Sequence, residues 1–371
     1  MSDVRQATVA AMPNAHSHAF QRDLRGLGER TPDDFWSWRT QMMHLAQALD
    51  PETMHRVAST VYSEMLETGY GAVGEFHYVH HRPDGTPYDE PNALAIALAQ
   101  AANEVGLRIV LIPAAYNRGG HPRFQDPDVE SFLARVDELR EWAAHHRDVS
   151  VAVAAHSVRA VPPDWLEAIA GYATDHALPR HVHASEQPRE VRECRSQHGA
   201  SPIELLNRTG FLGPRTSVIH AIHVDERDIA LLAETETIVI TCPTTEANLG
   251  DGHFPALAYR DAGVRLAIGS DSQVRVDPFE ETRELETGAR RAGLTRRALL
   301  AHYGDLWGEL ARNGLASLGL EAGATIGIDL DHRDLDGVGH DELPLALATC
   351  ASAGVVCRQA RRLRAGGGSG S

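Results

Sequence analysis

The stretch TVAAMPNAHSH, residues 8–18, runs from an apolar segment into two histidines that are separated by one residue. We expect residues 8–15 to form a β-strand, with His16 and His18 at its carboxyl end. Side chains alternate along a strand with a period of two, so the two imidazoles should point to the same side. Further along the chain, short apolar runs of the same kind alternate with longer amphipathic segments.

The other strands that we predict follow this alternation, with helices between them. They cover residues 71–76, 108–115, 149–155, 180–184, 216–221, 237–241 and 265–269. Eight strands with helical spacers indicate a parallel sheet, and the number eight favours closure into an α/β fold of the (β/α)8 TIM-barrel type. We assign residues 8–317 to this barrel and residues 318–365 to the remnant of a small accessory β-unit, with strand signals at 324–328 and 343–356. We interpret residues 366–371, GGGSGS, as a flexible linker or tag.

The composition excludes several classes of function. The chain has 371 residues, with 51 acidic and 35 basic side chains and a net charge of −16. This charge argues against a nucleic-acid partner and against an anionic membrane partner. All the basic residues are arginine, which excludes Schiff-base catalysis by lysine and a metal bridge built on a modified lysine. Four cysteines without a CxxC pair, and no signal segment, lead us to expect a cytoplasmic protein.

Polar side chains recur where the predicted strands end. After His16 and His18, these positions hold Glu75, Tyr78, His156, His183, His220 and Asp271. Because the carboxyl ends of barrel strands converge on one mouth, we expect one site there. Three imidazoles and a carboxylate suit Zn²⁺, or another divalent ion such as Fe²⁺, with one position open for water. We predict one ion per chain, held by His16, His18, His183 and Asp271.

These residues and several longer strings resemble the amidohydrolase superfamily, and more closely its formimidoylglutamate deiminases. The superfamily likeness rests on His16, His18, His183, His220 and Asp271 in this order. The closer likeness rests on PNAHSHAFQR (13–22), FWSWR (35–39), GEFHYVHH (74–81), HSVRAV (156–161), HVHASEQ (181–187), CPTTEANLGDG (242–252) and GSDS (269–272). The resemblance implies zinc-dependent hydrolysis of N-formimidoyl-L-glutamate to N-formyl-L-glutamate and ammonia, a reaction of histidine degradation.

Such a reaction needs proton transfers as well as a nucleophile. Bound zinc lowers the pKa of its water toward about 7, which supplies hydroxide to attack the C=N carbon. Glu186, three residues after His183, is the candidate acid for the imino nitrogen, although it also fits a helix N-terminal charge. We expect His220 to orient or deprotonate the water and Asp271 to be the other proton acceptor. His223 competes with His220, and the resemblance favours His220.

The resemblance also nominates residues that bind the substrate, which is a small dicarboxylate. Arg39 and Arg159 are candidates because a guanidinium binds a carboxylate through two parallel hydrogen bonds. Further hydrogen bonds are expected from Gln21, Tyr78 and His156. The roles of His253 and Gln273 stay open. For the assembly, a homodimer is the candidate.

Two other functions remain open. A deaminase of a related cyclic amidine, such as a nucleobase or a pterin, predicts an aromatic stacking wall and fewer arginines in the pocket. A metal-binding barrel without catalysis would tolerate loss of Glu186 or Asp271, yet both are present. Full-length relatives resemble a barrel flanked by a small β-sandwich built from both termini. We expect the N-terminal half of that sandwich to be missing, because few residues precede the first predicted strand.

Overall fold

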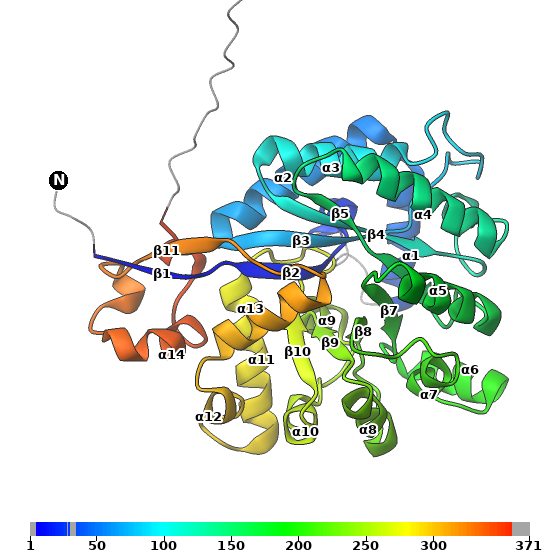
Figure 1. The fold of residues 1–371 in the computed structure, drawn as a ribbon. Helices are drawn as coiled ribbons and strands as arrows, with labels where there is room; N and C mark the ends of the chain where they lie inside the picture. Colours follow the sequence, from blue (N-terminus) through cyan, green and yellow to red (C-terminus); the bar gives the residue numbers. More distant parts are fainter. Residues whose placement is uncertain (1–4, 28, 30–34, 358–371) are drawn as a thin grey trace, which may run out of the picture.

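A computed structural model describes residues 5–27, 29 and 35–357 of the chain. At its centre, eight parallel strands form a barrel, shown in Figure 1. In spatial order they are β2 (Met12–Ser17), β3 (Tyr70–His77), β4 (Arg108–Ala115), β6 (Val153–Ser157), β7 (Arg180–Ala184), β8 (Thr216–His220), β9 (Ile238–Thr241) and β10 (Arg265–Ile268). The short strand β5 (Val149–Val151) also pairs with β4. The predicted (β/α)8 barrel class is confirmed.

The first and last barrel strands meet at the rim where the strands end. The amide of Asp271 donates to the carbonyl of His16 at 3.0 Å, and the amide of His18 donates to the carbonyl of Asp271 at 3.0 Å. Gly269 permits this approach, because a Cβ there would lie 2.6 Å from the His16 carbonyl oxygen. The barrel therefore closes at residues that we predicted to bind metal.

Helices cover the outside of the barrel (Figure 1). The longer ones are α1 (Phe35–Gln47), α2 (Pro51–Thr68), α3 (Ala93–Val105), α4 (Val129–Ala144), α5 (Pro163–Asp175), α6 (Pro188–His198), α8 (Glu226–Glu234), α11 (Pro278–Gly293) and α13 (Leu306–Ser317). Shorter helical elements are η1 (Ala19–Leu24), η3 (Pro122–Phe124), α7 (Pro202–Arg208), α9 (Pro243–Leu249), α10 (Ala256–Ala262) and α12 (Leu300–Tyr303). Several begin at a proline, which suits the first turn because a helix leaves the amides there unpaired. No helix within the described ranges has the length and apolar character needed to span a membrane.

Three strand predictions need correction. Residues 8–15 form two strands, because the chain changes sheet at Ala11, whose amide donates to the carbonyl of Ala324. The first of them, β1 (Gln6–Ala10), pairs antiparallel with β11 (Thr325–Asp329) beside the barrel, so residues 8–10 lie in the accessory pair. Residues 149–155 are likewise divided between β5 and β6.

The third correction concerns residues 343–356, where helical elements replace the expected strand. They are α14 (Leu343–Leu347) and η6 (Ala353–Val355), preceded by η4 (Arg333–Leu335) and η5 (His340–Glu342). Leu343, Ala346 and Leu347 are buried. These three side chains are spaced by three and four residues, which is the period of a helix and not that of a strand. The predicted strand at 343–356 is therefore wrong. The division at residue 317 stays a prediction, and residues 366–371 lie outside the described ranges.

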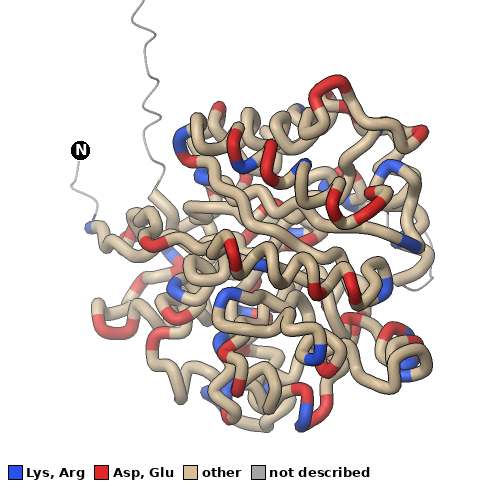
Figure 2. The backbone as a smooth tube through the Cα atoms, turned by 45° about the vertical axis from the view of Figure 1, so that its right-hand side comes forward, with Lys and Arg blue, Asp and Glu red and all other residues tan. Residues whose placement is uncertain are grey.

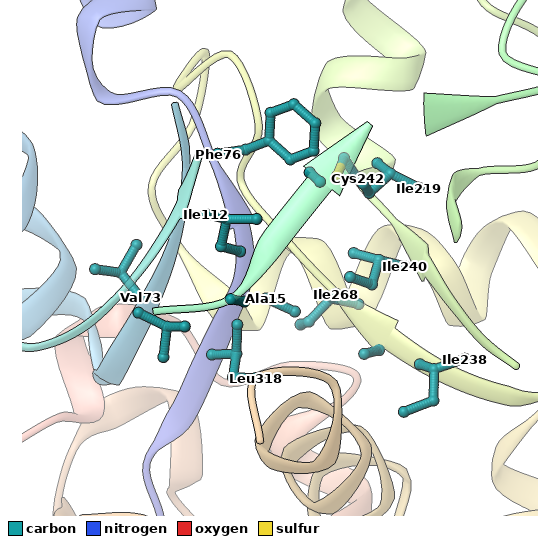
Figure 3. Packing of buried hydrophobic residues seen from close by; sticks show 14 of the residues in the cluster. Ala15, Val73, Phe76, Ile112, Ile219, Ile238, Ile240, Cys242, Ile268 and Leu318 are labelled. Atoms are coloured by element: carbon teal, nitrogen blue, oxygen red, sulfur yellow. The ribbon is translucent and has the colours of Figure 1, made fainter. Parts of the chain in front are cut away.

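The barrel interior is packed with apolar side chains. Figure 3 shows Ile112, Ile240 and Ile268 between the strands, with Phe76 toward one end and Leu318 toward the other. Layers of branched side chains of this kind fill TIM barrels, so the interior is a solid core. On the outside, acidic and basic positions are scattered over the surface, as Figure 2 shows. The polar site must therefore lie at the strand ends above the core.

Candidate metal and active site

The structure brings the four predicted metal ligands together at the carboxyl rim of the barrel. The Nε2 atoms of His16 and His183 lie 3.0 Å apart. Oδ1 of Asp271 is 3.5 Å from Nε2 of His16 and 3.5 Å from Nε2 of His18. All four side chains are buried. The four residues come from β2, β7 and the segment after β10, so tertiary structure alone unites them.

The hydrogen bonds of these histidines fit a divalent cation. Nδ1 of His18 lies 2.8 Å from the carbonyl of Phe76, and Nδ1 of His183 lies 2.9 Å from the carbonyl of His156. A ring that donates from Nδ1 to a carbonyl keeps a lone pair on Nε2 for a metal. Burial, above all, lowers the pKa of His16 to about 3, so its ring is neutral at ordinary pH. Nδ1 of His16 has no hydrogen-bond partner among the described residues. In the tautomer that carries its proton on Nδ1, the Nε2 lone pair of His16 faces that of His183, an arrangement that suits a shared cation. The nitrogens of His16, His18 and His183 form a group that could hold a metal ion, and with the Asp271 carboxylate 3.5 Å away the set suits a divalent metal.

His220 lies beside this cluster and touches two of the predicted acid–base residues. Its Nε2 is 3.7 Å from Oε1 of Glu186 and 3.8 Å from Oδ2 of Asp271. Its Nδ1 is 3.2 Å from Oε1 of Glu246, a residue that the sequence analysis missed. Burial disfavours the charged ring, but the carboxylates of Glu186, Glu246 and Asp271 outweigh it and raise the pKa of His220 to about 10. The alternative, His223, donates from Nε2 to the Asp251 carbonyl at 2.7 Å and takes no part in this group.

Glu246 is fixed by its own element. It lies in the first turn of α9 and accepts from Thr241 Oγ1 and from the Cys242 amide, both at 2.8 Å. A carboxylate held in this way sets the orientation of the imidazole that it faces. The string CPTTEANLGDG contained the signal, since it puts a glutamate in a helix that begins directly after a barrel strand.

Arg159, predicted to bind substrate, pairs with the predicted acid. Its Nη2 donates to Oε2 of Glu186 at 3.0 Å, and its Nε lies 3.9 Å from Oε1 of Glu190. Oε2 of Glu190 in turn accepts the amide of Glu186 at 3.0 Å. Burial opposes its charge, but the carboxylates of Glu190 and Glu186 raise the pKa of Arg159, so its cation is firmly held.

The other predicted substrate residues line one side of the site. Gln21 Nε2 donates to Tyr78 Oη at 3.0 Å, and the ring centroids of Tyr78 and His156 are 5.2 Å apart. Arg39, from α1, donates to Tyr116 Oη at 3.0 Å. The Tyr116 and His156 centroids are 4.5 Å apart. Tyr116, at the end of β4, was not predicted, because its segment holds neither histidine nor carboxylate.

Asp251 is another buried residue that the sequence analysis missed. Its Oδ1 accepts from Nε2 of Gln187, and its Oδ2 has no hydrogen-bond partner among the described residues. Burial, followed by the charge of Glu186, raises the pKa of Asp251 to about 9. The neighbouring His253 is exposed, so it stays outside the buried group.

Backbone strain is concentrated around the site. Positive φ angles occur at Ser185 (55°), His220 (71°), Asp271 (47°) and Gln273 (64°). Non-glycine residues adopt this conformation at a cost of about 1–3 kcal/mol each, which the surrounding structure must offset. These angles aim side chains from the strand ends into one buried cluster.

Comparison with known proteins agrees with this geometry. The sequence profile of the amidohydrolase family matches residues 8–322. Formimidoylglutamate deiminase of Pseudomonas aeruginosa is 39% identical over 308 residues, which cover 79% of this chain and 67% of that protein. A 5-methylthioadenosine/S-adenosylhomocysteine deaminase of Nitratidesulfovibrio vulgaris is 31% identical over 70% of this chain and 54% of that protein.

Solved structures share the fold. An amidohydrolase from Brucella melitensis superposes with a TM-score of 0.85 and 34% identity, covering 94% of this chain and 84% of that one. A zinc-bound adenosine deaminase from Xanthomonas campestris gives 0.81 at 24% identity, covering 95% of this chain and 78% of that one, and so bears on the fold alone. From the profile match and the 39% identical relative, the chain belongs to the amidohydrolase family, hydrolases that act on C–N bonds.

Proposed function

We propose that the protein is a zinc-dependent deiminase that hydrolyses N-formimidoyl-L-glutamate to N-formyl-L-glutamate and ammonia. The observation that carries this is the 3.0 Å contact between Arg159 and Glu186, which sets a carboxylate-binding cation beside the candidate acid. The 39% identity to a formimidoylglutamate deiminase supports the same substrate. In the reaction, water adds to the C=N carbon, the C–N bond to the terminal nitrogen breaks, and that nitrogen leaves as ammonia.

His16, His18, His183 and Asp271 would hold the metal. A divalent ion in such a site lowers the pKa of water and polarises the group under attack. His220, 3.8 Å from Asp271 and 3.7 Å from Glu186, lies where it can orient the attacking water, and Asp271 would accept the proton. Glu246 keeps that ring in place from the other side.

Glu186 would deliver a proton to the terminal nitrogen, which must become an amine before it leaves. Its carboxylate accepts from Arg159 through Oε2, while Oε1 faces His220. This division leaves Oε1 of Glu186 directed toward His220 and Oε2 toward Arg159. General acids and bases of this kind contribute about 10²- to 10⁴-fold to the rate.

Two arginines would hold the substrate carboxylates. Nη2 of Arg159 donates to Glu186 and its Nε faces Glu190 at 3.9 Å, so Nη1 and the second hydrogen on Nη2 would be the donors offered to a ligand. Arg39 uses Nη2 for Tyr116 Oη and the Gly119 carbonyl. Gln21, Tyr78 and His156 would complete the polar lining.

One observation favours a second candidate. Tyr78, Tyr116 and His156 form an aromatic wall, with centroid separations of 4.5 Å and 5.2 Å from the histidine to the two tyrosines. A flat heterocycle binds such a wall, so the cyclic amidine of an adenine nucleoside is the alternative substrate. The two arginines have no evident role toward a neutral nucleoside, which puts this candidate second.

The test is ammonia release from N-formimidoyl-L-glutamate and from 5′-methylthioadenosine, each with the zinc-loaded protein. We expect ammonia and N-formyl-L-glutamate in equal amounts from the first substrate, and at most a trace of ammonia from the second. Ammonia from the nucleoside alone would overturn the proposal in favour of the second candidate.

A further inference from the structure

Ser17, the residue between His16 and His18, is bound to a buried glutamate. Its Oγ donates to Oε2 of Glu75 at 2.7 Å, and the Ala19 amide donates to Oε1 of Glu75 at 2.7 Å. Glu75 lies near the end of β3 and is 2% exposed. Its two oxygens therefore hold the residues on both sides of His18.

Gln273 continues this network on the other side of Ser17. Its Nε2 donates to Ser17 Oγ at 2.9 Å and to the carbonyl of Asp271 at 2.7 Å. Its Oε1 accepts from Ser270 Oγ at 2.8 Å. Ser270 accepts from Nδ2 of Asn14 at 2.6 Å and donates its amide to Oδ1 of Asn14 at 3.0 Å. Gln273, Ser17, Ser270 and Asn14 are all fully buried.

The hydrogen bonds of these side chains run in one direction. Asn14 donates to Ser270, Ser270 to Gln273, Gln273 to Ser17, and Ser17 to Glu75, where the series ends on the buried carboxyl group. Every hydroxyl both donates and accepts, so the network is satisfied. Buried networks of this kind hold one arrangement, because any rearrangement leaves a polar group unpaired.

The network crosses the seam between β2 and β10, where the barrel closes. On that seam, His16 and His18 come from β2 and Asp271 follows β10. Asn14 crosses the seam through its bonds to Ser270. Gln273 crosses it through its bond to Ser17 while also holding the Asp271 carbonyl, with a φ of 64° at Gln273. Its contacts thus join segments that hold three of the four candidate ligands.

We propose that Gln273 is a positioning residue for the metal site, fixing His16 and His18 relative to Asp271 through Ser17 and the Asp271 carbonyl. The inference rests on the proposed function only in requiring that these residues bind a divalent ion. It does not depend on which substrate is hydrolysed.

The test compares three variants loaded with Co²⁺, whose visible absorption reports ligand geometry. Gln273→Met keeps the length of the side chain and removes its hydrogen bonds, while Ser17→Ala removes one link and leaves Gln273 intact. Asn313→Leu is the matched control, because Nδ2 of buried Asn313 donates to the carbonyl of Leu266, at the far end of the same strand β10. Removal of an outer-shell partner typically costs 10- to 100-fold in metal affinity.

We expect Gln273→Met to lose Co²⁺ to a chelator about 10- to 100-fold faster than the parent, with a shifted spectrum. Ser17→Ala should show a smaller change in both the rate of Co²⁺ loss and the spectrum, in the same direction. If Gln273→Met does not fold, the result for Ser17→Ala tests the inference instead. An unchanged spectrum and loss rate would overturn the inference, as would equal changes in Asn313→Leu.

Co²⁺ binding and ammonia release by the unmutated protein distinguish a failure of this inference from a failure of the proposed function. If the unmutated protein binds no Co²⁺, both are overturned. If it binds Co²⁺ but releases no ammonia from N-formimidoyl-L-glutamate, the proposed function fails, and the spectra of the variants still decide the role of Gln273.

Discussion

At the scale of single residues, the pairing of Glu186 with Arg159 changes how each is understood. The sequence analysis assigned Glu186 as the candidate acid and Arg159 as a residue that binds a substrate carboxylate, and it predicted no contact between the two. The structure joins them at 3.0 Å. A substrate carboxylate would share Arg159 with that glutamate.

Glu186→Gln should keep the metal and lose about 10²- to 10⁴-fold in kcat, because it removes a proton donor and leaves the predicted ligands intact. Glu193→Gln, on the neighbouring helix α6, is the control, since Glu193 is exposed and pairs with Arg189. Metal content and kcat are measured together. A Glu186→Gln enzyme within threefold of the parent, with its metal bound, would refute the assignment.

Arg159→Met should lower kcat/KM for the dicarboxylate at least about tenfold, because charge-assisted hydrogen bonds are worth about 1.5–3 kcal/mol each. An analogue with the substrate carboxylate replaced by an amide should lose much less. Arg189→Met, which removes a half-exposed arginine stacked near Trp36, serves as the control. An equal fractional loss of kcat/KM for the acid and for the amide would indicate that Arg159 has a structural role, holding Glu186 and Glu190 in place, and does not bind the substrate carboxylate.

At the scale of elements, the sequence predicted where strands end better than where they begin. The polar residues at the ends of β2, β6, β7 and β8 interrupt apolar runs, so those ends were visible. The sheet change at Ala11 was not, because β1 and β2 form one apolar run and differ only in their partners. For Glu246, the string CPTTEANLGDG places a glutamate in a helix directly after a barrel strand, whereas Asp251 reaches the site from the loop after α9, where no local pattern predicts its direction.

Gly269→Ala tests the close approach of β10 to β2. Its Cβ would meet backbone atoms of His16 at 2.6 and 2.9 Å, so β2 or β10 must shift. We expect a loss of about 1–3 kcal/mol in unfolding free energy, and weaker metal binding. Gly288→Ala in α11 meets nothing within 4 Å and should stabilise by up to about 1 kcal/mol. Urea unfolding measures both, and a Gly269→Ala protein as stable as the parent would contradict the packing described.

At the scale of the whole molecule, strand count and the alternation of strands with helices were enough to predict the barrel, because few topologies bury eight parallel strands. The accessory part was predicted less well. Among the residues that the structure describes, its N-terminal contribution is strand β1, paired with β11. Pairing between residues so far apart in the chain leaves no trace in local sequence.

Buried histidines should make global stability depend on pH. Burial, followed by the charges of Arg135 and Arg123, lowers the pKa of His77 from its ordinary value of 6.5 to about 3. The folded state therefore needs the neutral ring. The contribution of His77 to the free energy of unfolding is fully present above about pH 6.5 and declines as the pH falls toward 3. The groups around it that also carry or take up charge are Arg123, Arg135, His18, His80 and His81.

In metal-free protein, the unfolding free energy should fall between pH 7 and pH 4.5, and His77→Gln should make that fall less steep. Urea unfolding at several pH values in the presence of a chelator gives both slopes. Parallel slopes for parent and variant would show that His77 is not held neutral by the fold.

The central claim is that one divalent ion, bound by His16, His18, His183 and Asp271, supports hydrolysis of N-formimidoyl-L-glutamate. The most direct measurement is ammonia release from this substrate as zinc is added to the metal-free protein. We predict no activity without zinc, a linear rise, and saturation at one equivalent per chain. Activity that persists without metal, or that saturates only at two equivalents, would contradict the claim.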